Sequence, residues 1–253
     1  QKLLWSDQGS SHSDDGGSDT AAVHIFGSYK HKVSGEASTL NFSRANNVFD
    51  IVTYDGNGTG QTVSHNLGAT PELIIIKKFN GNTSQDWYAY SKTLGKGAYV
   101  RPNQRNGISY STTVFNNTAP TSSVFSVGQN NDVNENGDDF VAYLWASSEN
   151  VSHVGTYTGT GSNIDIDCNF TGDAVFVMIK CTSHPGDWVY FSDALGFNSS
   201  TSNYLKWNQS SNEATGTHLI QPISGGFRVK PGSDTYTNTN TSGNTYIYLA
   251  YSE

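Results

Sequence analysis

The stretch Asp50-Ile-Val-Thr-Tyr-Asp-Gly-Asn-Gly58, followed by Leu73-Ile-Ile-Ile-Lys77, recurs about one hundred residues further along the chain. The second occurrence reads Val154-Gly-Thr-Tyr-Thr-Gly-Thr-Gly161, followed by Phe176-Val-Met-Ile-Lys180. A period of this kind is the signature of a duplicated structural module. We therefore call residues 49–147 the first repeat and residues 148–253 the second repeat.

The match between the repeats continues to their ends. Gly137–Tyr143 closes the first repeat as Gly243–Leu249 closes the second. Further matched residues lie between these points: Asp86-Trp87 with Asp187-Trp188, Tyr99 with Tyr204, and Asn103 with Asn208.

The hydrophobic pattern within each repeat is that of β-strands. Leu73–Ile76 and Val175–Ile179 are unbroken apolar runs of strand length, which predicts central strands covered on both faces. Phe140–Trp145 alternates in side-chain size, as half-buried strands do, and Gly- and Asn-rich turns separate the runs. The sequence predicts an all-β fold of two tandem antiparallel β-sandwich domains, similar to jelly rolls, with an extended N-terminal segment.

The N-terminal segment, residues 1–48, is expected to be a linker or attachment segment, since residues 6–20 are small and polar. Leu3-Leu-Trp-Ser6 is similar to the closing strand of each repeat. It is either the end of an upstream repeat or a chance apolar tetrad. Ala22–Phe26 and Ser38–Phe42 could each form a short strand, on this chain or on a neighbouring subunit.

Charge and hydrophobicity exclude several kinds of partner. The 253 residues carry a net charge of -8, and Lys and Arg form no large cluster, which argues against nucleic acid and anionic membranes. No apolar run approaches the roughly 18 residues of a membrane-spanning helix, so no membrane insertion is expected.

Cys168 and Cys181 are expected to be unpaired thiols. A hairpin turning at Thr171-Gly-Asp173 would set Cys181 several residues along the ladder from Cys168, beyond the roughly 7 Å reach of a disulfide.

The chain has no motif of a known catalytic class. It lacks a nucleophile elbow, a zinc-protease motif, a phosphate-binding glycine loop and a Cys-x-x-Cys pair, so we expect no enzyme and no cofactor. His65, before Asn66-Leu-Gly68, is expected to be a turn or surface residue.

Asp132-Val-Asn-Glu-Asn-Gly137 reproduces the first half of a calcium loop, which makes Asp132, Asn134, Asn136 and Asp138 weak calcium candidates. The second repeat keeps the turn at Asn238-Thr-Asn-Thr-Ser-Gly243 and has no carboxylate there. A hydrogen-bonded hairpin turn without an ion is therefore the favoured reading.

The paired Asp86-Trp87 and Asp187-Trp188 allow two interpretations. A Trp ring beside a carboxylate is typical of sugar-binding sites, where the ring stacks on the sugar and the acid accepts hydroxyl hydrogens. Alternatively, the Trp fills the core and the Asp ends a turn, which we favour because large aromatics dominate such cores.

Residues 49–253 resemble a repeat found in tail-fibre and other virion-appendage proteins of marine phages, including phages of cyanobacteria. Five segments of the first repeat resemble it: Phe49-Asp-Ile-Val-Thr-Tyr-Asp-Gly-Asn-Gly58, Val63-Ser-His-Asn-Leu-Gly68, Pro71-Glu-Leu-Ile-Ile-Ile-Lys77, Asp86-Trp-Tyr88 and Pro120-Thr-Ser-Ser-Val-Phe125. The second repeat matches through Gly155-Thr-Tyr-Thr-Gly159, Trp188 and the ending Tyr246-Ile-Tyr-Leu-Ala-Tyr-Ser-Glu253. Such an ending is typically the C-terminus of proteins of that family.

The resemblance implies a phage virion structural protein, the distal region of a tail fibre or appendage involved in host-surface recognition. It implies a homotrimer, contacts with other virion proteins and with a host surface glycan or protein, and a place in the virion after assembly in the host cytoplasm. It transfers no catalytic residues. The alternatives are a carbohydrate-binding, lectin-like module and a capsid-decorating fibre.

Host contact is expected on the loops that differ most between the repeats, because strands are committed to the core. These loops are Phe79–Gln85 against Thr182–Gly186, and Arg101–Tyr110 against Lys206–His218. Their aromatic and basic side chains are the candidate receptor contacts: Arg105, Tyr110, His184 and Trp207. The alternative is that these loops pack against the neighbouring repeat or subunit.

Overall fold

The computed structural model of the chain describes residues 47–80, 85–200, 202–210, 212–214, 219–234 and 237–252. The strands expected at 22–26 and 38–42 and the linker at 6–20 lie outside these residues. Within them the predicted all-β fold is confirmed: sixteen strands form antiparallel sheets, and the α-helix α1 (Asn131–Asn134) is a single turn. None of the helices in these ranges is long and apolar enough to span a membrane.

The first repeat is built on a four-stranded sheet with the order β1-β8-β3-β4. Its strands are β1 (Phe49–Asp55), β8 (Asp139–Trp145), β3 (Leu73–Lys78) and β4 (Tyr88–Ser91). Two small two-stranded sheets complete the repeat. They pair β2 (Gln61–Ser64) with β7 (Val124–Val127), and β5 (Ala98–Tyr99) with β6 (Ser109–Tyr110).

The second repeat has a five-stranded sheet with the order β13-β12-β11-β16-β9. Its strands are β13 (Leu205–Lys206), β12 (Trp188–Ser192), β11 (Ala174–Cys181), β16 (Thr245–Ser252) and β9 (Ser152–Thr158). A small sheet orders β10 (Ile164–Asp167), β15 (Gly226–Val229) and β14 (Ile220–Ile223). The strand order β9-β16-β11-β12 of the second repeat matches the order β1-β8-β3-β4 of the first repeat, strand for strand.

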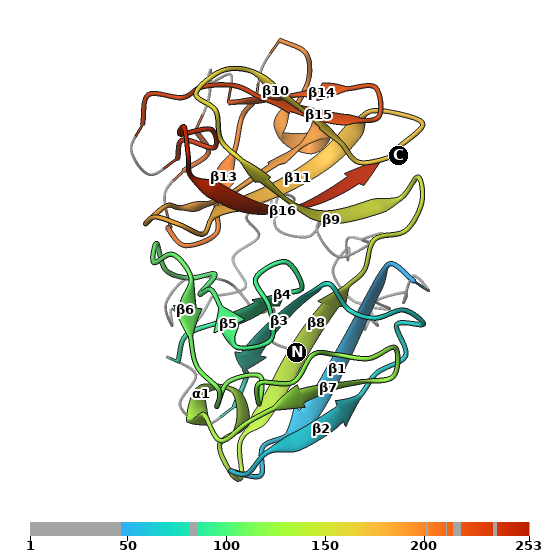
Figure 1. The fold of residues 1–253 in the computed structure, drawn as a ribbon, viewed down its shortest axis with the longest axis vertical. Helices are drawn as coiled ribbons and strands as arrows, with labels where there is room; N and C mark the ends of the chain where they lie inside the picture. The colour runs from blue at the N-terminus through green and yellow to red at the C-terminus, as the bar shows by residue number, and fades with distance from the viewer. Residues whose placement is uncertain are drawn as a thin grey trace, which may run out of the picture.

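The large sheets of the two repeats face each other (Figure 1). On its opposite side, the large sheet of the first repeat carries β2 and β7, and that of the second repeat carries β10, β15 and β14. Successive residues of a strand point to opposite faces of the sheet. Accordingly, Ile74 and Ile76 of β3 pack towards β2 and β7, whereas Leu73 and Ile75 pack towards the second repeat. All four are at most 2% exposed, which confirms the prediction of a strand covered on both faces.

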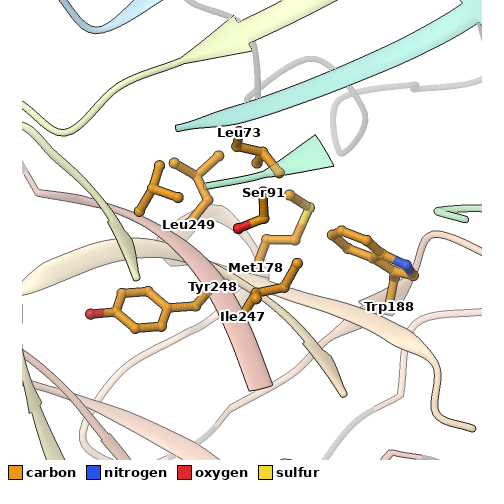
Figure 2. A pocket seen from close by; sticks show the side chains of 8 residues that line it. Leu73, Ser91, Met178, Trp188, Ile247, Tyr248 and Leu249 are labelled. Atoms are coloured by element: carbon orange, nitrogen blue, oxygen red, sulfur yellow. The ribbon is translucent and has the colours of Figure 1, made fainter. Parts of the chain in front are cut away.

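We call the apolar cluster shared by the two large sheets the seam. Figure 2 shows side chains of both repeats meeting there: Leu73 and Ser91 lie against Met178, Trp188, Ile247 and Leu249. The pocket that these residues line is too narrow to admit a water molecule. Flexible Met178 fills the irregular space between the sheets, as methionine does in many cores. The seam is therefore a dry core of the molecule.

Cys168 and Cys181 are free and buried, as predicted. The hairpin used to predict this is wrong, however, because β10 pairs with β15, and β11 pairs with β12 and β16. Cys168 directly follows β10 and Cys181 ends β11, and both thiols lie in one core. Burial raises the pKa of Cys168 to about 12, so this thiol stays protonated at neutral pH.

Candidate functional site: the loops along the seam

Each Asp-Trp pair is held by an asparagine side chain at the matching position of its own repeat. Asn103 donates to Asp86 at 2.9 Å and accepts from the backbone N–H of Trp87 at 3.0 Å. In the second repeat, Asn208 donates to Asp187 at 2.8 Å and accepts from the N–H of Trp188 at 2.9 Å. One asparagine thus fixes the carboxylate and the strand start together.

The cage around each aspartate has further members that the sequence comparison missed. Gln104 donates to Asp86 at 2.7 Å, and Gln209 donates to Asp187 at 3.1 Å. Arg101 lies 3.3 Å from Asp86, and Lys206 lies 3.2 Å from Asp187. The signal was present in the sequence, since a basic residue, any residue, Asn and Gln stand in that order in both repeats.

The tryptophan rings face the seam. Trp87 is 4% exposed and Trp188 is 1% exposed, so neither ring can stack on a sugar. The core interpretation of the Asp-Trp pairs is therefore correct. Burial alone would raise the pKa of Asp187, but hydrogen bonds from Arg105, Asn208 and Lys206 lower it. The carboxylate is thus ionised and organises the loops around it.

The loop at residues 101–108 of the first repeat is fastened to the second repeat. Arg105 forms an ion pair with Asp187 at 2.6 Å, and its backbone oxygen accepts from the N–H of Gly186 at 2.8 Å. The N–H of Ile108 donates to the oxygen of Thr182 at 2.7 Å. Two of the loops that differ between the repeats, at residues 101–108 and 182–186, therefore meet across the seam.

Lys180 reinforces this contact from inside the protein. Its side chain is fully buried, and Nζ donates to the backbone oxygens of Arg105 at 2.9 Å and Gly186 at 2.5 Å. A weaker bond reaches the oxygen of Gln104 at 3.4 Å. Burial lowers the pKa of Lys180 to about 8. A single ammonium group thus joins backbone from both repeats.

The four predicted receptor contacts divide into two groups. Trp207 is 7% exposed and packs edge-on against Trp87 at 5.7 Å, so its assignment as a surface contact is corrected. It fills the seam, because the loop that carries it folds over the neighbouring repeat. Arg105 is engaged with Asp187, and its side chain is 40% exposed.

Tyr110 and His184 face solvent. Tyr110 is 74% exposed at the end of β6, and His184 is exposed in the loop that receives Gly107 and Ile108. These two residues remain predicted contacts, on loops whose backbone is fixed by the seam.

In the calcium-like turn, the side chain of Asn134 joins neighbouring backbone segments by hydrogen bonds. Buried Asn134 accepts from the N–H of Asn57 at 3.0 Å and donates to the oxygens of Gly128 and Thr59. Asn240 takes the same place in the second repeat, where it accepts from the N–H of Thr160 at 2.8 Å. A hydrogen-bonded turn is thus present in both repeats.

The other calcium candidates have different neighbours. Asp132 accepts from the hydroxyl of Tyr88 at 2.5 Å, Asp138 pairs with Lys78 at 2.7 Å, and Asn136 is exposed. In the described part of the chain, no three His, Cys, Asp or Glu side chains gather as a metal site.

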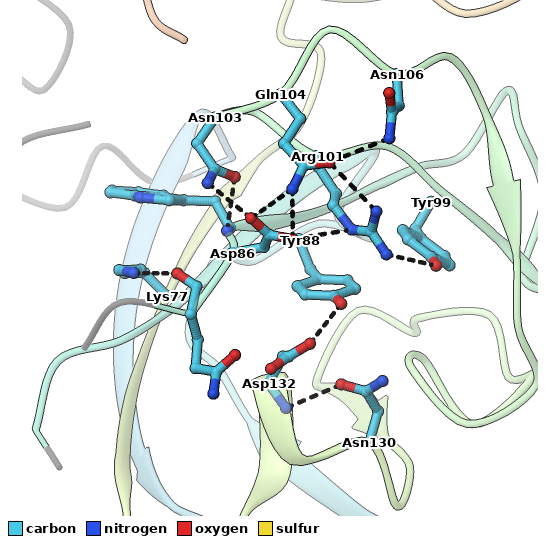
Figure 3. Close-up of polar contacts among 12 residues, drawn as sticks. Lys77, Asp86, Tyr88, Tyr99, Arg101, Asn103, Gln104, Asn106, Asn130 and Asp132 are labelled. Carbon is cyan, nitrogen blue, oxygen red and sulfur yellow. Dashed lines mark hydrogen bonds and ion pairs between the residues drawn. The ribbon is translucent and has the colours of Figure 1, made fainter. Parts of the chain in front are cut away.

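A polar network specific to the first repeat surrounds Arg101 (Figure 3). Its guanidinium lies 5.4 Å from the ring centres of both Tyr88 and Tyr99. Burial and the neighbouring Asp132 raise the pKa of Tyr88, so its hydroxyl keeps the proton that it donates to that carboxylate. Val189 stands at the position of Tyr88 in the second repeat, which therefore lacks this network.

A search of the curated proteins and one of the solved structures found no match. A family model described as a domain of unknown function, DUF7483, matches residues 27–253. The match covers most of the chain and spans both repeats together with the seam. This chain belongs to the DUF7483 family.

Proposed function

We propose that this chain is a structural protein of a phage virion, the distal region of a tail fibre or similar appendage, and that it contacts the host surface through loops at the seam. The resemblance of both repeats to virion-appendage proteins supports the proposal. The observation that carries the contact surface is Tyr110, which is 74% exposed on β6, a strand paired with β5.

An exposed tyrosine on a fixed loop is well suited to binding. Tyrosine offers a large amphipathic ring at low entropic cost, and rigid loops lose little freedom when a partner binds. β6 pairs with β5, the N–H of Ser111 donates to the oxygen of Gly97 at 2.9 Å, and Ile108 is bound to Thr182. The ring of Tyr110 is therefore displayed from a backbone anchored on both sides.

Adsorption of the labelled chain to a panel of marine bacteria and cyanobacteria tests this function. We expect binding to particular strains, and Tyr110→Ala should reduce it several-fold with an unchanged circular dichroism spectrum. Thr112→Ala, a nearby exposed side chain, is the matched control and should bind normally. Equal binding by both variants would refute the role of Tyr110.

The exposed tyrosine also favours the second candidate, a carbohydrate-binding module. Mass in solution separates the two, because a stable trimer fits a fibre and a monomer that binds isolated glycans fits a lectin. A density map of the intact particle that contains this chain would establish the virion assignment directly.

A further inference from the structure

The two repeats bury the same face against each other. Strand matching makes β3 equivalent to β11 and β8 equivalent to β16, and the seam contains equivalent positions from each pair. Matched residues of the two repeats lie there together: Leu73 with Phe176, Ile75 with Met178, Trp87 with Trp188, Val141 with Ile247, and Tyr143 with Leu249. The seam is therefore formed by one kind of surface meeting itself.

One pair of tryptophan contacts with the loops across the seam is approximately reciprocal as well. The ring N–H of Trp188 in the second repeat donates to the oxygen of Arg101 in the first repeat at 3.2 Å. In return, Trp87 of the first repeat packs against Trp207, which adjoins Lys206, the counterpart of Arg101. When residue i touches j′ and j touches i′, the two units are related by an approximate twofold axis.

A twofold pairing closes on itself, whereas a head-to-tail contact leaves a surface open for the next unit. We propose that this face, the seam face, is a self-pairing surface whose partner is the seam face of another repeat, and that a second copy of this chain can supply that partner. The repeats then associate strictly in pairs. They do not stack into an extended array, as solenoid repeats do.

The connection between the repeats directs the pairing within one chain. β8 ends at Trp145 and β9 begins at Ser152, and between them Ser148 bonds to Ser152 and Val151 while Asn150 adopts a left-handed conformation with φ of 61°. This tight turn folds the second repeat back over the first. Shortening such a hinge is a known route to exchange of units between chains.

Deletion of Glu149–Val151 in the full chain tests the proposal. We expect the seam to form between chains, which gives a closed oligomer with at least twice the mass of the unchanged protein in light scattering. Tryptophan emission should stay blue-shifted, because Trp87, Trp188 and Trp207 remain buried in the seam. Insertion of a flexible Gly-Ser stretch at the same place is the control and should leave the mass of the unchanged protein. A folded deletion variant with the mass of the unchanged protein and red-shifted emission would overturn the proposal.

A second variant tests self-pairing even if the deletion variant does not fold. This variant gives the second repeat the seam residues of the first through four substitutions: Phe176→Leu, Met178→Ile, Ile247→Val and Leu249→Tyr. If the face pairs with itself, this variant should keep the mass of the unchanged protein and melt within a few degrees of it.

The control for this transplant places the same four residue types in a different order: Phe176→Val, Met178→Tyr, Ile247→Leu and Leu249→Ile. It should melt much lower, since its side chains do not match the partner face. Equal melting temperatures for the transplant and the reordered control would contradict self-pairing.

Discussion

Replacement of Lys180 by methionine is expected to abolish the rise in stability that the unchanged protein shows at alkaline pH. The methionine keeps the length of the side chain and removes a fully buried ammonium group. Two opposing effects follow. The oxygens of Arg105, Gly186 and Gln104 lose a charged donor, and loss of hydrogen bonds to a charged group weakens a protein by about 1.5–3 kcal/mol each. Against this, the variant no longer has to bury a cation.

The size of the second effect follows from the pKa of Lys180, which burial lowers to about 8. An exposed lysine titrates near 10.5, and each pKa unit is worth about 1.4 kcal/mol, so the buried charge destabilises the fold by about 3 kcal/mol at neutral pH. Between pH 8 and 10.5 the unfolded chain binds more protons than the folded chain. The free energy of unfolding of the unchanged protein should therefore rise with pH across this range, and that of Lys180→Met should not.

Urea denaturation followed by tryptophan fluorescence measures the difference. We expect Lys180→Met to be less stable by about 1–3 kcal/mol at pH 7, and the gap to widen by about 2 kcal/mol at pH 9.5. Lys96→Met, at an exposed position, controls for the loss of one positive charge. A gap that stays constant or narrows between pH 7 and 9.5 would refute the assignment of Lys180 as a charged group buried across the seam.

Three further predictions concern single residues. Trp207→Ala should lower the free energy of unfolding by about 3–5 kcal/mol in urea titrations, because it leaves a cavity in the seam. A change below about 1 kcal/mol would mean that the ring is not buried in solution. Burial lowers the pKa of His65, whose Nδ1 accepts from the N–H of Leu67. The stability of the protein should therefore fall as the pH drops below 6.5, and the stability of His65→Asn should fall less steeply. Melting temperatures between pH 7 and 5 measure the difference. Asn134→Ala should destabilise the chain by about 2 kcal/mol or more, because its hydrogen-bond partners are left unpaired. Calcium or a chelator should shift the melting temperature of neither the unchanged protein nor the variant in calorimetry. A rise of the melting temperature with calcium would support a calcium site at this turn.

The repeated motifs made the strand content of the fold predictable from the sequence. Period-two patterns and turn residues are local signals, and the unbroken run at Leu73–Ile76 correctly indicated a strand with two covered faces. What covers the second face was not visible, because a sequence pattern reports that a side chain is buried and not which residues bury it. The neighbouring repeat, more than one hundred residues away, provides the cover.

The same limit explains the errors at the candidate site. Trp207 stands in a polar loop, so local sequence placed it on the surface, and only the pairing of the sheets brings it against Trp87. Lys180 looks like an ordinary lysine at the end of an apolar strand, yet one of its acceptors, the oxygen of Arg105, lies 75 residues earlier in the chain. Tyr110 was selected correctly as an exposed side chain, because exposure at a loop end depends little on distant contacts.

The alternation of side chains along β3 and β8 has a consequence for how the molecule comes apart. Each large sheet contributes to two cores at once, so neither sheet can lose its strand order without opening both. The two repeats should therefore unfold in one transition, and all the main strands should lose hydrogen-exchange protection in one concerted event. Exposed side chains such as Tyr110 belong to neither core, which lets the outer surface of the molecule vary in sequence while its interior unfolds as a single cooperative unit.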